Sequence, residues 1–393
     1  MTNRLWQQLA IATNWPVLAA VTLLSGLGVL SVWSNSPADG TKQLYFLFVA
    51  LGAMLAVQAI NYLNLGRWAW GLYVLSLLLI IYTLLGAAAE THHHSLPGVH
   101  AINKVHCWIT FAGFSFEPSE LMKLSYVMVL ARYLRFRSNY RTLRGLLPPL
   151  VLTLLPMALI LKQPALGVAT LFFPTLMAML FVAGAKIRHL AAVIGIGIGL
   201  APIFWLSGEK NVPVLRHFPA FVHDYQRGYV RGLFGNDPKT LRESGFQQQR
   251  ALVASGSGGI TGKGVGEIPV GQGVPEARND MIFAIIGEQF GLVGSITVLA
   301  AYIVLFAAGT EIAAATREPF GRLVAVGIVS FLAAQAFLNL MVAMRLFPVT
   351  GVTLPFVSSG GSSLVASCIA AGLLLNIGQN RPLVIARDSF EFD

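Results

Sequence analysis

The chain has 393 residues, of which 55% are hydrophobic and only 11% are charged. A soluble domain carries roughly 25% charged residues, so the composition excludes an ordinary soluble protein. It favours a chain embedded in lipid, where each charge in the hydrocarbon is costly. Lys and Arg number 27 against 17 for Asp and Glu. In a membrane protein such an excess is typical of basic cytoplasmic loops, and we expect no nucleic-acid partner.

Hydrophobic stretches recur from one end of the chain to the other. A membrane-spanning helix needs about 20 mostly apolar residues. The sequence predicts about ten such helices, which we place at 13–33, 44–63, 68–88, 118–134, 146–161, 167–185, 188–206, 281–309, 322–344 and 362–378. The predicted fold class is an all-α polytopic membrane protein. Irregular backbone at membrane depth survives only when protein covers it or when it lines a cavity, so we interpret the Pro- and Gly-rich segments 108–118 and 346–362 as re-entrant or surface caps.

Basic residues in the short loops predict the orientation. With the N-terminus in the cytoplasm, 13 Lys and Arg residues lie inside and four lie outside, at Lys42, Lys104, Lys162 and Arg345. Lys and Arg concentrate in cytoplasmic loops. An even number of spans then returns the C-terminus to the cytoplasm as well.

A large extracytoplasmic loop, residues 207–280, is predicted between the seventh and eighth spans. Loops of this length are usually functional. Its nine basic residues are Lys210, Arg216, Arg227, Arg231, Lys239, Arg242, Arg250, Lys263 and Arg278. Two interpretations stay open: a solvated loop, since long loops are exempt from the charge bias, and a surface that binds an anionic ligand at the membrane.

Two motifs suggest cofactors and fail in detail. The glycine run 256–264 lacks the glycine and the hydroxyl residue that a P-loop requires around Gly262-Lys263. Its backbone amides would still suit a lipid pyrophosphate. The histidines at 92–94, 100 and 106 have no spaced Cys/His partners, so an exposed loop is favoured over a zinc site.

The few acidic residues in or beside predicted spans are more informative. Glu120, Asp280 and Glu288 lie there, and ionisable groups at membrane depth are functional candidates. Glu120 can pair with Lys123 three residues on, which a purely structural ion pair would also explain. Asp280 opens the eighth span, where a carboxylate is also favoured by the helix dipole. Glu276, four residues earlier, is a candidate to share its face.

Five motifs resemble, in order, those of the SEDS family (RodA, FtsW and SpoVE) between about residues 100 and 381. Residues 117–123 (EPSELMK) resemble QPSE-x-x-K, and 163–167 (QPALG) resemble QPDLG. The loop segments 245–247, 256–259 and 262–264 resemble GYQ…GSGG…GKG. Residues 275–288 resemble PEAHTDFIFA…GEE, and 348–363 resemble PVTG…LPF-x-SYGGSS.

The resemblance implies one SEDS-type transmembrane domain over 1–393, with ten spans, in the inner (cytoplasmic) membrane. It implies a peptidoglycan glycosyltransferase that polymerises lipid II into β-1,4 glycan strands during cell elongation or division. A class B penicillin-binding protein would be the transpeptidase partner, with membrane lipid around the chain. Two alternatives stay open: a catalytically impaired scaffold that activates such a partner, and a lipid II flippase.

The family's essential Asp matches Asp280, which would act as the general base or orient the acceptor hydroxyl. The leaving pyrophosphate needs compensating charge, from basic loop residues or from a divalent cation such as Mg²⁺ or Mn²⁺ whose ligands the sequence does not indicate. The expected substrate-binding residues are Glu120, Lys123, Arg231, Gln247, Lys263, Glu276, Arg278, Ser358 and Ser362.

Six residues are the main departures from the family pattern. They are Ala165 for the QPDLG aspartate, Cys107 for the arginine before Trp108, Arg278-Asn279 for His-Thr, Arg250 for the second glutamine after GYQ, and Ser359 for the SYGG tyrosine. Because a carboxylate and a guanidinium are missing near the expected site, the sequence predicts a divergent branch, either active or with altered substrate handling.

Overall fold

The computed structural model describes residues 14–91, 96–99, 105–111, 114–137, 139–163, 165–207, 227–228 and 245–379. Its long helices are α2 (Trp15–Asn35), α3 (Pro37–Ala59), α5 (Ala69–Thr91), α6 (Pro118–Phe136), α7 (Leu147–Lys162), α8 (Leu166–Val182), α9 (Ile187–Leu206), α13 (Ile282–Ala315), α14 (Pro319–Ala343) and α15 (Gly361–Gln379). Shorter elements are α4 (Tyr62–Arg67), α12 (Phe246–Ser257), the 3₁₀ turns η1 (Asn139–Arg141), η2 (Arg144–Leu146) and η3 (Gly271–Gly273), and the strands β1 (Ile109–Phe111) and β2 (Phe114–Phe116).

Each predicted span overlaps one of the long helices. In the described residues, seven helices are long and apolar enough to cross a membrane, namely α2, α3, α5, α7 with its preceding turn, α13, α14 and α15. Helices α8 and α9 are apolar, but their apolar parts are shorter, and α6 carries one acidic and three basic residues. The multi-pass architecture is therefore confirmed, while the count of ten crossings stays a prediction.

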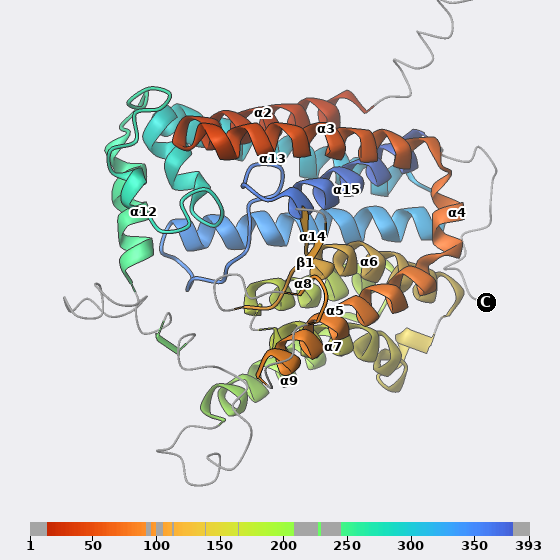
Figure 1. Cartoon of the computed structure of the whole chain (residues 1–393). Coiled ribbons are helices and arrows are strands. Elements are labelled where there is room, and N and C mark those ends of the chain that lie inside the picture. The colour runs from red at the N-terminus through yellow and green to blue at the C-terminus, as the bar shows by residue number, and fades with distance from the viewer. Residues whose placement is uncertain are drawn as a thin grey trace, which may run out of the picture.

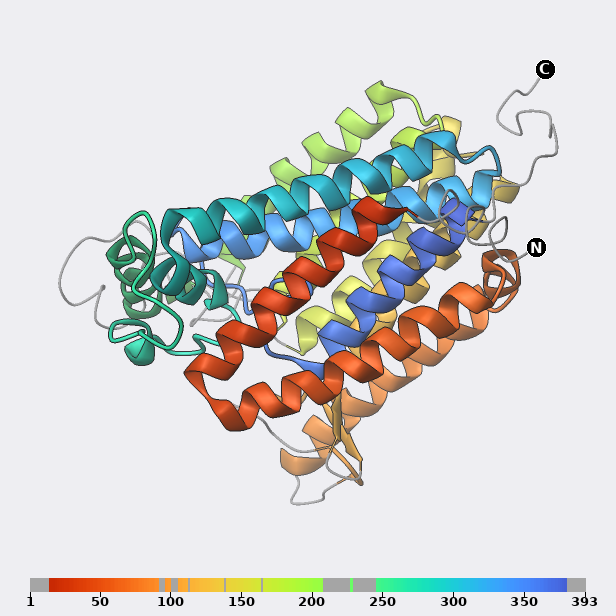
Figure 2. The ribbon, with the colours of Figure 1, turned by 90° about the horizontal axis from the view of Figure 1, so that it is seen from above.

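The helices form one bundle around α14 (Figure 1). Helix α14 packs against α6, α8 and α13, while α15 packs against α3, and α2 packs against α13. Seen from above, α2 and α15 cross the bundle obliquely (Figure 2). Small residues permit this close packing. A Cβ on Gly327 would lie 2.5 Å from Val127 Cγ1, and one on Gly372 would lie 2.7 Å from the Met54 carbonyl oxygen.

Helix α13 differs from the single predicted span at 281–309. It breaks at Gly291, whose φ of 63° and ψ of −153° are not helical. The break frees backbone groups, and the glycine-rich turn after α12 bonds to them: Leu292 N donates to Gly259 O at 2.9 Å, and Val293 N donates to Ile260 O at 3.1 Å. The apolar segment 292–315 is still long enough to cross a membrane on its own.

The two predicted caps are irregular, as expected, with one addition. Within the first cap, strands β1 and β2 pair antiparallel, with Ile109 opposite Phe116, so the fold is not purely helical. The second cap, 346–360, runs without helix or strand between α14 and α15. Of the predicted outer loop, only 207, 227–228 and 245–280 are described, and Arg231 lies outside the described residues.

Candidate functional site

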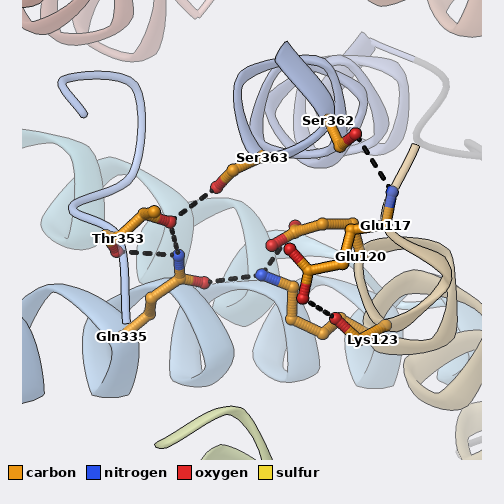
Figure 3. Close-up of polar contacts among 8 residues, drawn as sticks. Glu117, Glu120, Lys123, Gln335, Thr353, Ser362 and Ser363 are labelled. Carbon is orange, nitrogen blue, oxygen red and sulfur yellow. Dashed lines mark hydrogen bonds and ion pairs between the residues drawn. The ribbon is translucent and has the colours of Figure 1, made fainter. Parts of the chain in front are cut away.

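A chain of polar side chains crosses the bundle between α6, α14, the 346–360 segment and α15 (Figure 3). Lys123 Nζ lies 2.7 Å from Glu120 Oε2 and donates to Gln335 Oε1 at 2.9 Å. Gln335 Nε2 donates to the Thr353 carbonyl at 3.0 Å, and Thr353 Oγ1 lies 2.9 Å from Ser363 Oγ. The predicted Glu120–Lys123 pair is confirmed, and Lys123 also bonds to Gln335 of α14.

The two charges in this polar chain are buried and paired with each other. Glu120 is 4% exposed and Lys123 is 6% exposed. Removing one partner of such a pair would leave an uncompensated buried charge, at a cost of about 3–5 kcal/mol. A cavity of about 20 Å³ lies beside the pair, which is room for one water molecule.

Asp280 lies in the turn just before α13 and is half-buried. Its carbonyl oxygen accepts from Asn339 Nδ2 of α14 at 2.9 Å. Its carboxylate faces Gly351, where an added Cβ would lie 3.9 Å from Oδ2. Burial, with a smaller contribution from the Glu276 carboxylate, raises the pKa of Asp280 from 3.8 to about 7. The side chain is thus suited to exchange a proton near neutral pH.

Glu117 is a second carboxylate in the same region, and the sequence argument did not single it out. Its backbone N–H donates to Ser362 Oγ at 3.2 Å, and Ser119 Oγ donates to Glu117 Oε1 at 2.5 Å. Burial and then Glu120 raise the pKa of Glu117 to about 7, and Asp280 adds to the rise. Asp280 and Glu117 are therefore close enough to interact. The sequence did contain a signal, because residue 117 is a glutamate where the family motif QPSE-x-x-K has glutamine.

The turn that holds Asp280 is tied to the segment before α15. Ser358 Oγ donates to the Asn279 carbonyl at 2.6 Å and accepts from Leu354 N at 2.7 Å. Glu276 and Phe356 both have positive φ, 50° and 66°, and such strained positions cluster at functional sites. Ser358, expected to bind substrate, thus holds two site segments together.

Lys263 is engaged at a different point. Its ammonium lies 2.6 Å from Glu288 Oε1, and the Glu288 side chain is fully buried. Val270 N and Gly271 N also donate to that carboxylate, at 3.0 and 2.7 Å. Glu288, the third acidic candidate, thereby anchors the glycine-rich loop to α13. Pyrophosphate binding by Lys263 stays a prediction.

Three more of the expected substrate-binding residues lie in or against the turn that carries Asp280. Arg278 forms an ion pair with Asp39 of α3. Glu276 accepts from Asn279 Nδ2 at 2.6 Å. Gln247 Nε2 donates to the Pro275 carbonyl at 3.0 Å. The structure therefore brings Glu276, Arg278 and Gln247 to the turn that carries Asp280.

In the part of the chain that the structure describes, no group of three or more His, Cys, Asp and Glu side chains is arranged to hold a metal ion. His106, one of the clustered histidines, pairs with Glu90. The other four histidines of that cluster lie outside the described residues. A divalent cation stays a prediction.

Two departures from the family pattern meet at one place. Cys107 is buried, and its thiol donates to the Gln163 carbonyl at 3.2 Å. Gln163 is two residues before Ala165. The two departures therefore lie close to each other in the fold.

Known proteins resemble this chain over nearly its whole length. The family profile described as "Cell cycle protein", which covers FtsW, RodA and SpoVE, matches residues 5–382. Stage V sporulation protein E of Bacillus subtilis is 32% identical over 372 residues, with 92% of this chain and 94% of that protein covered. The probable peptidoglycan glycosyltransferase FtsW of Geobacter metallireducens is 32% identical over 378 residues, with 92% and 93% covered.

Solved structures agree with this relationship. A peptidoglycan synthase complex, described in terms of coordinated polymerization and crosslinking, contains a chain that matches with a TM-score of 0.76 and 27% identity, covering 95% of this chain and 99% of that one. The rod shape determining protein RodA of Thermus thermophilus matches with a TM-score of 0.66 and 26% identity, covering 94% and 97%. This chain therefore belongs to the FtsW/RodA/SpoVE family of multi-pass membrane proteins.

Proposed function

We propose that the protein is a peptidoglycan glycosyltransferase that polymerises lipid II into β-1,4 glycan strands. The observation that carries the proposal is the half-buried Asp280 carboxylate in the turn before α13, a turn that Asn339 and Ser358 tie to α14 and to the segment before α15. Several relatives of this length are named probable peptidoglycan glycosyltransferases, which supports the same reaction.

The reaction requires one bond to form and one to break at the sugar C1 of the lipid-linked donor. The oxygen of the acceptor's GlcNAc 4-hydroxyl attacks C1, and its proton passes to the Asp280 carboxylate. The bond from C1 to the pyrophosphate oxygen breaks, and undecaprenyl pyrophosphate leaves. A base works best when its pKa lies near the operating pH, which is where Asp280 is held.

Charge compensation for the leaving pyrophosphate has three candidate side chains. Lys263 and Arg278 each already face a carboxylate, Glu288 and Asp39. Arg231 lies outside the described residues. A divalent cation is a further source. Glu120 and Lys123 would shape the floor of the site, since their network extends to Ser363 at the start of α15.

The setting proposed for this reaction is the cytoplasmic membrane, with both termini in the cytoplasm and the Asp280 turn outside. The orientation rests on the 13 inner against four outer basic residues. The partner is a class B penicillin-binding protein, which would cross-link the strands. The similarity to a chain of a peptidoglycan synthase complex supports a partner of this kind.

The test uses the purified full chain, alone and with a class B penicillin-binding protein, incubated with lipid II and Mg²⁺ or Mn²⁺. We expect polymer from the wild type and none from Asp280→Ala. The matched control is Glu267→Ala, because Glu267 is an exposed acidic residue of the same outer loop. Full polymerisation by Asp280→Ala would refute the role of this side chain.

The same preparations separate the two alternative functions. A scaffold would raise the activity of the penicillin-binding protein equally with and without the Asp280 carboxylate, and would make no polymer. A flippase would move lipid II across liposome membranes without joining sugars. Either result would replace the glycosyltransferase proposal.

A further inference from the structure

A polar hollow of about 380 Å³ lies next to the turn that carries Asp280. Its walls come from three distant parts of the chain: the turn between α2 and α3, the turn before α13, and the segment before α15. The polar side chains that define it belong to Asn35, Asp39, Gln272, Glu276, Arg278 and Asn279. Ligand pockets in proteins typically occupy about 300–1,000 Å³, so the hollow is large enough for a small ligand.

The charge of the lining decides which part of a lipid-linked sugar fits. Two carboxylates, of Asp39 and Glu276, oppose one guanidinium, of Arg278. Lys42 adds a second cation at the edge of the hollow, 3.8 Å from Asp39 Oδ1. The charges balance, so no cation is left over to compensate the negative charge of a pyrophosphate. The carboxamides of Asn35 and Gln272 both donate and accept hydrogen bonds. Hydroxyl and acetamido groups of an uncharged sugar match such a lining.

The lining is held in place before any ligand arrives. Ser36 Oγ donates to Asp39 Oδ2 at 3.0 Å, and Arg278 pairs with the same oxygen. Ser359 N donates to the Arg278 carbonyl at 2.8 Å. Fixed polar groups lose little freedom on binding, which favours recognition.

The position of the hollow indicates which sugar it receives. Asn279 lines it and is followed directly by Asp280. Asp280 is the base that we propose for the acceptor hydroxyl, so a sugar in the hollow would lie with an edge near that carboxylate. We infer that the hollow is a subsite for the neutral saccharide that accepts the transferred sugar, an inference that rests on the proposed function.

Binding without turnover tests this inference. The probe is a short soluble glycan of GlcNAc–MurNAc-peptide repeats, without lipid or pyrophosphate, added to the full chain in detergent. Loss of a hydrogen bond to an uncharged group weakens binding by about fivefold, and we expect that loss for Gln272→Ala. Gln272 is exposed, so the substitution should not affect folding. The control is Glu267→Ala, because Glu267 is an exposed polar residue of the same outer loop and does not line the hollow.

Two outcomes would overturn the inference. Equal glycan affinity for wild type, Gln272→Ala and Asp39→Asn would show that the sugar binds elsewhere. In a competition experiment, undecaprenyl pyrophosphate could displace the glycan from the wild type. If Gln272→Ala also weakened the binding of undecaprenyl pyrophosphate, the hollow would be the site of the pyrophosphate and not of the sugar. In turnover, Gln272→Ala should raise KM by about fivefold with kcat unchanged, and an unchanged KM would also count against the subsite.

The inference and the proposed function can fail separately. Asp280→Ala should still bind the glycan through the hollow, whose lining keeps all its side chains, while making no polymer. Polymerisation that depends on Asp280, with glycan binding insensitive to Gln272 and Asp39, would refute only the subsite. Glycan binding that depends on Gln272, in a wild type that makes no polymer, would refute only the glycosyltransferase.

Discussion

The pKa of Asp280 can be changed without touching Asp280. The Glu276 carboxylate raises that pKa, and burial is the larger of the two causes. Glu276 thus accounts for less than half of the rise from 3.8 to about 7. The substitution Glu276→Gln removes the charge while keeping an oxygen that can accept from Asn279. We expect the pKa of Asp280 to fall by about one pH unit, or about 1.4 kcal/mol.

The sign of the effect on activity follows from the role of a base. Asp280 must be deprotonated to accept a proton, so activity rises as pH increases through its pKa. A lower pKa moves this rise to lower pH. At pH 6 the deprotonated fraction would increase about fivefold, from roughly a tenth to a half. Near pH 8 both proteins are mostly deprotonated and their difference should largely vanish.

The assay is the pH dependence of kcat/KM for polymerisation, measured from pH 5 to 9 on wild type, Glu276→Gln and Glu267→Gln. Glu267 is an exposed acid of the same loop, so its substitution should leave the midpoint unchanged. Because Glu276 also lines the saccharide hollow, the midpoint and not the amplitude is the measured quantity. An unmoved midpoint in Glu276→Gln, with activity retained, would refute the electrostatic link to Asp280.

Two further predictions concern stability, measured as thermal transitions in detergent. Cys107→Arg should destabilise the protein, because it buries an unpaired charge, whereas Ala165→Asp places a carboxylate at the N-cap of α8, where the helix dipole favours it. The double variant should recover about 1–3 kcal/mol of the Cys107→Arg loss; strictly additive effects would show that the two positions do not meet. Gly291→Ala would place a Cβ 2.4 Å from Gly262 N at a positive φ, so we expect a loss of about 2 kcal/mol or more. Gly256→Ala meets nothing within 4 Å and should retain wild-type stability, whereas equal transitions for both variants would contradict the strained kink.

Hydrophobic run length was enough to predict where the helices lie, because lipid imposes a minimum length on every crossing. It was not enough to predict the break at Gly291, since a glycine inside an apolar run gives no local signal of its backbone conformation. The break depends on the turn around Ile260, whose contact with α13 no periodicity encodes.

The site shows the same division between local and distant contacts. The Glu120–Lys123 pair was predictable because both residues lie on one helix face. Gln335, the next partner of Lys123, comes from α14, 212 residues away. The pairing of Arg278 with Asp39 likewise joins the outer loop to the first helical turn of α3. The count of Lys and Arg residues predicted a basic loop. It did not predict that Lys263 and Arg278 would pair with Glu288 and Asp39.

Glu117 and Ala165 change the meaning of the departures from the family pattern. The first motif has a glutamate where the family has glutamine, and the second has an alanine where the family has aspartate. Both positions are helix N-caps, of α6 and α8, where the helix dipole favours a negative charge. Relative to the family pattern, a carboxylate is therefore gained at Glu117 and lost at Ala165. The Glu117 carboxylate lies close enough to Asp280 for their charges to interact. Because the number of carboxylates at these two positions is kept, the departures favour a glycosyltransferase with a rearranged site over a scaffold that has lost its chemistry.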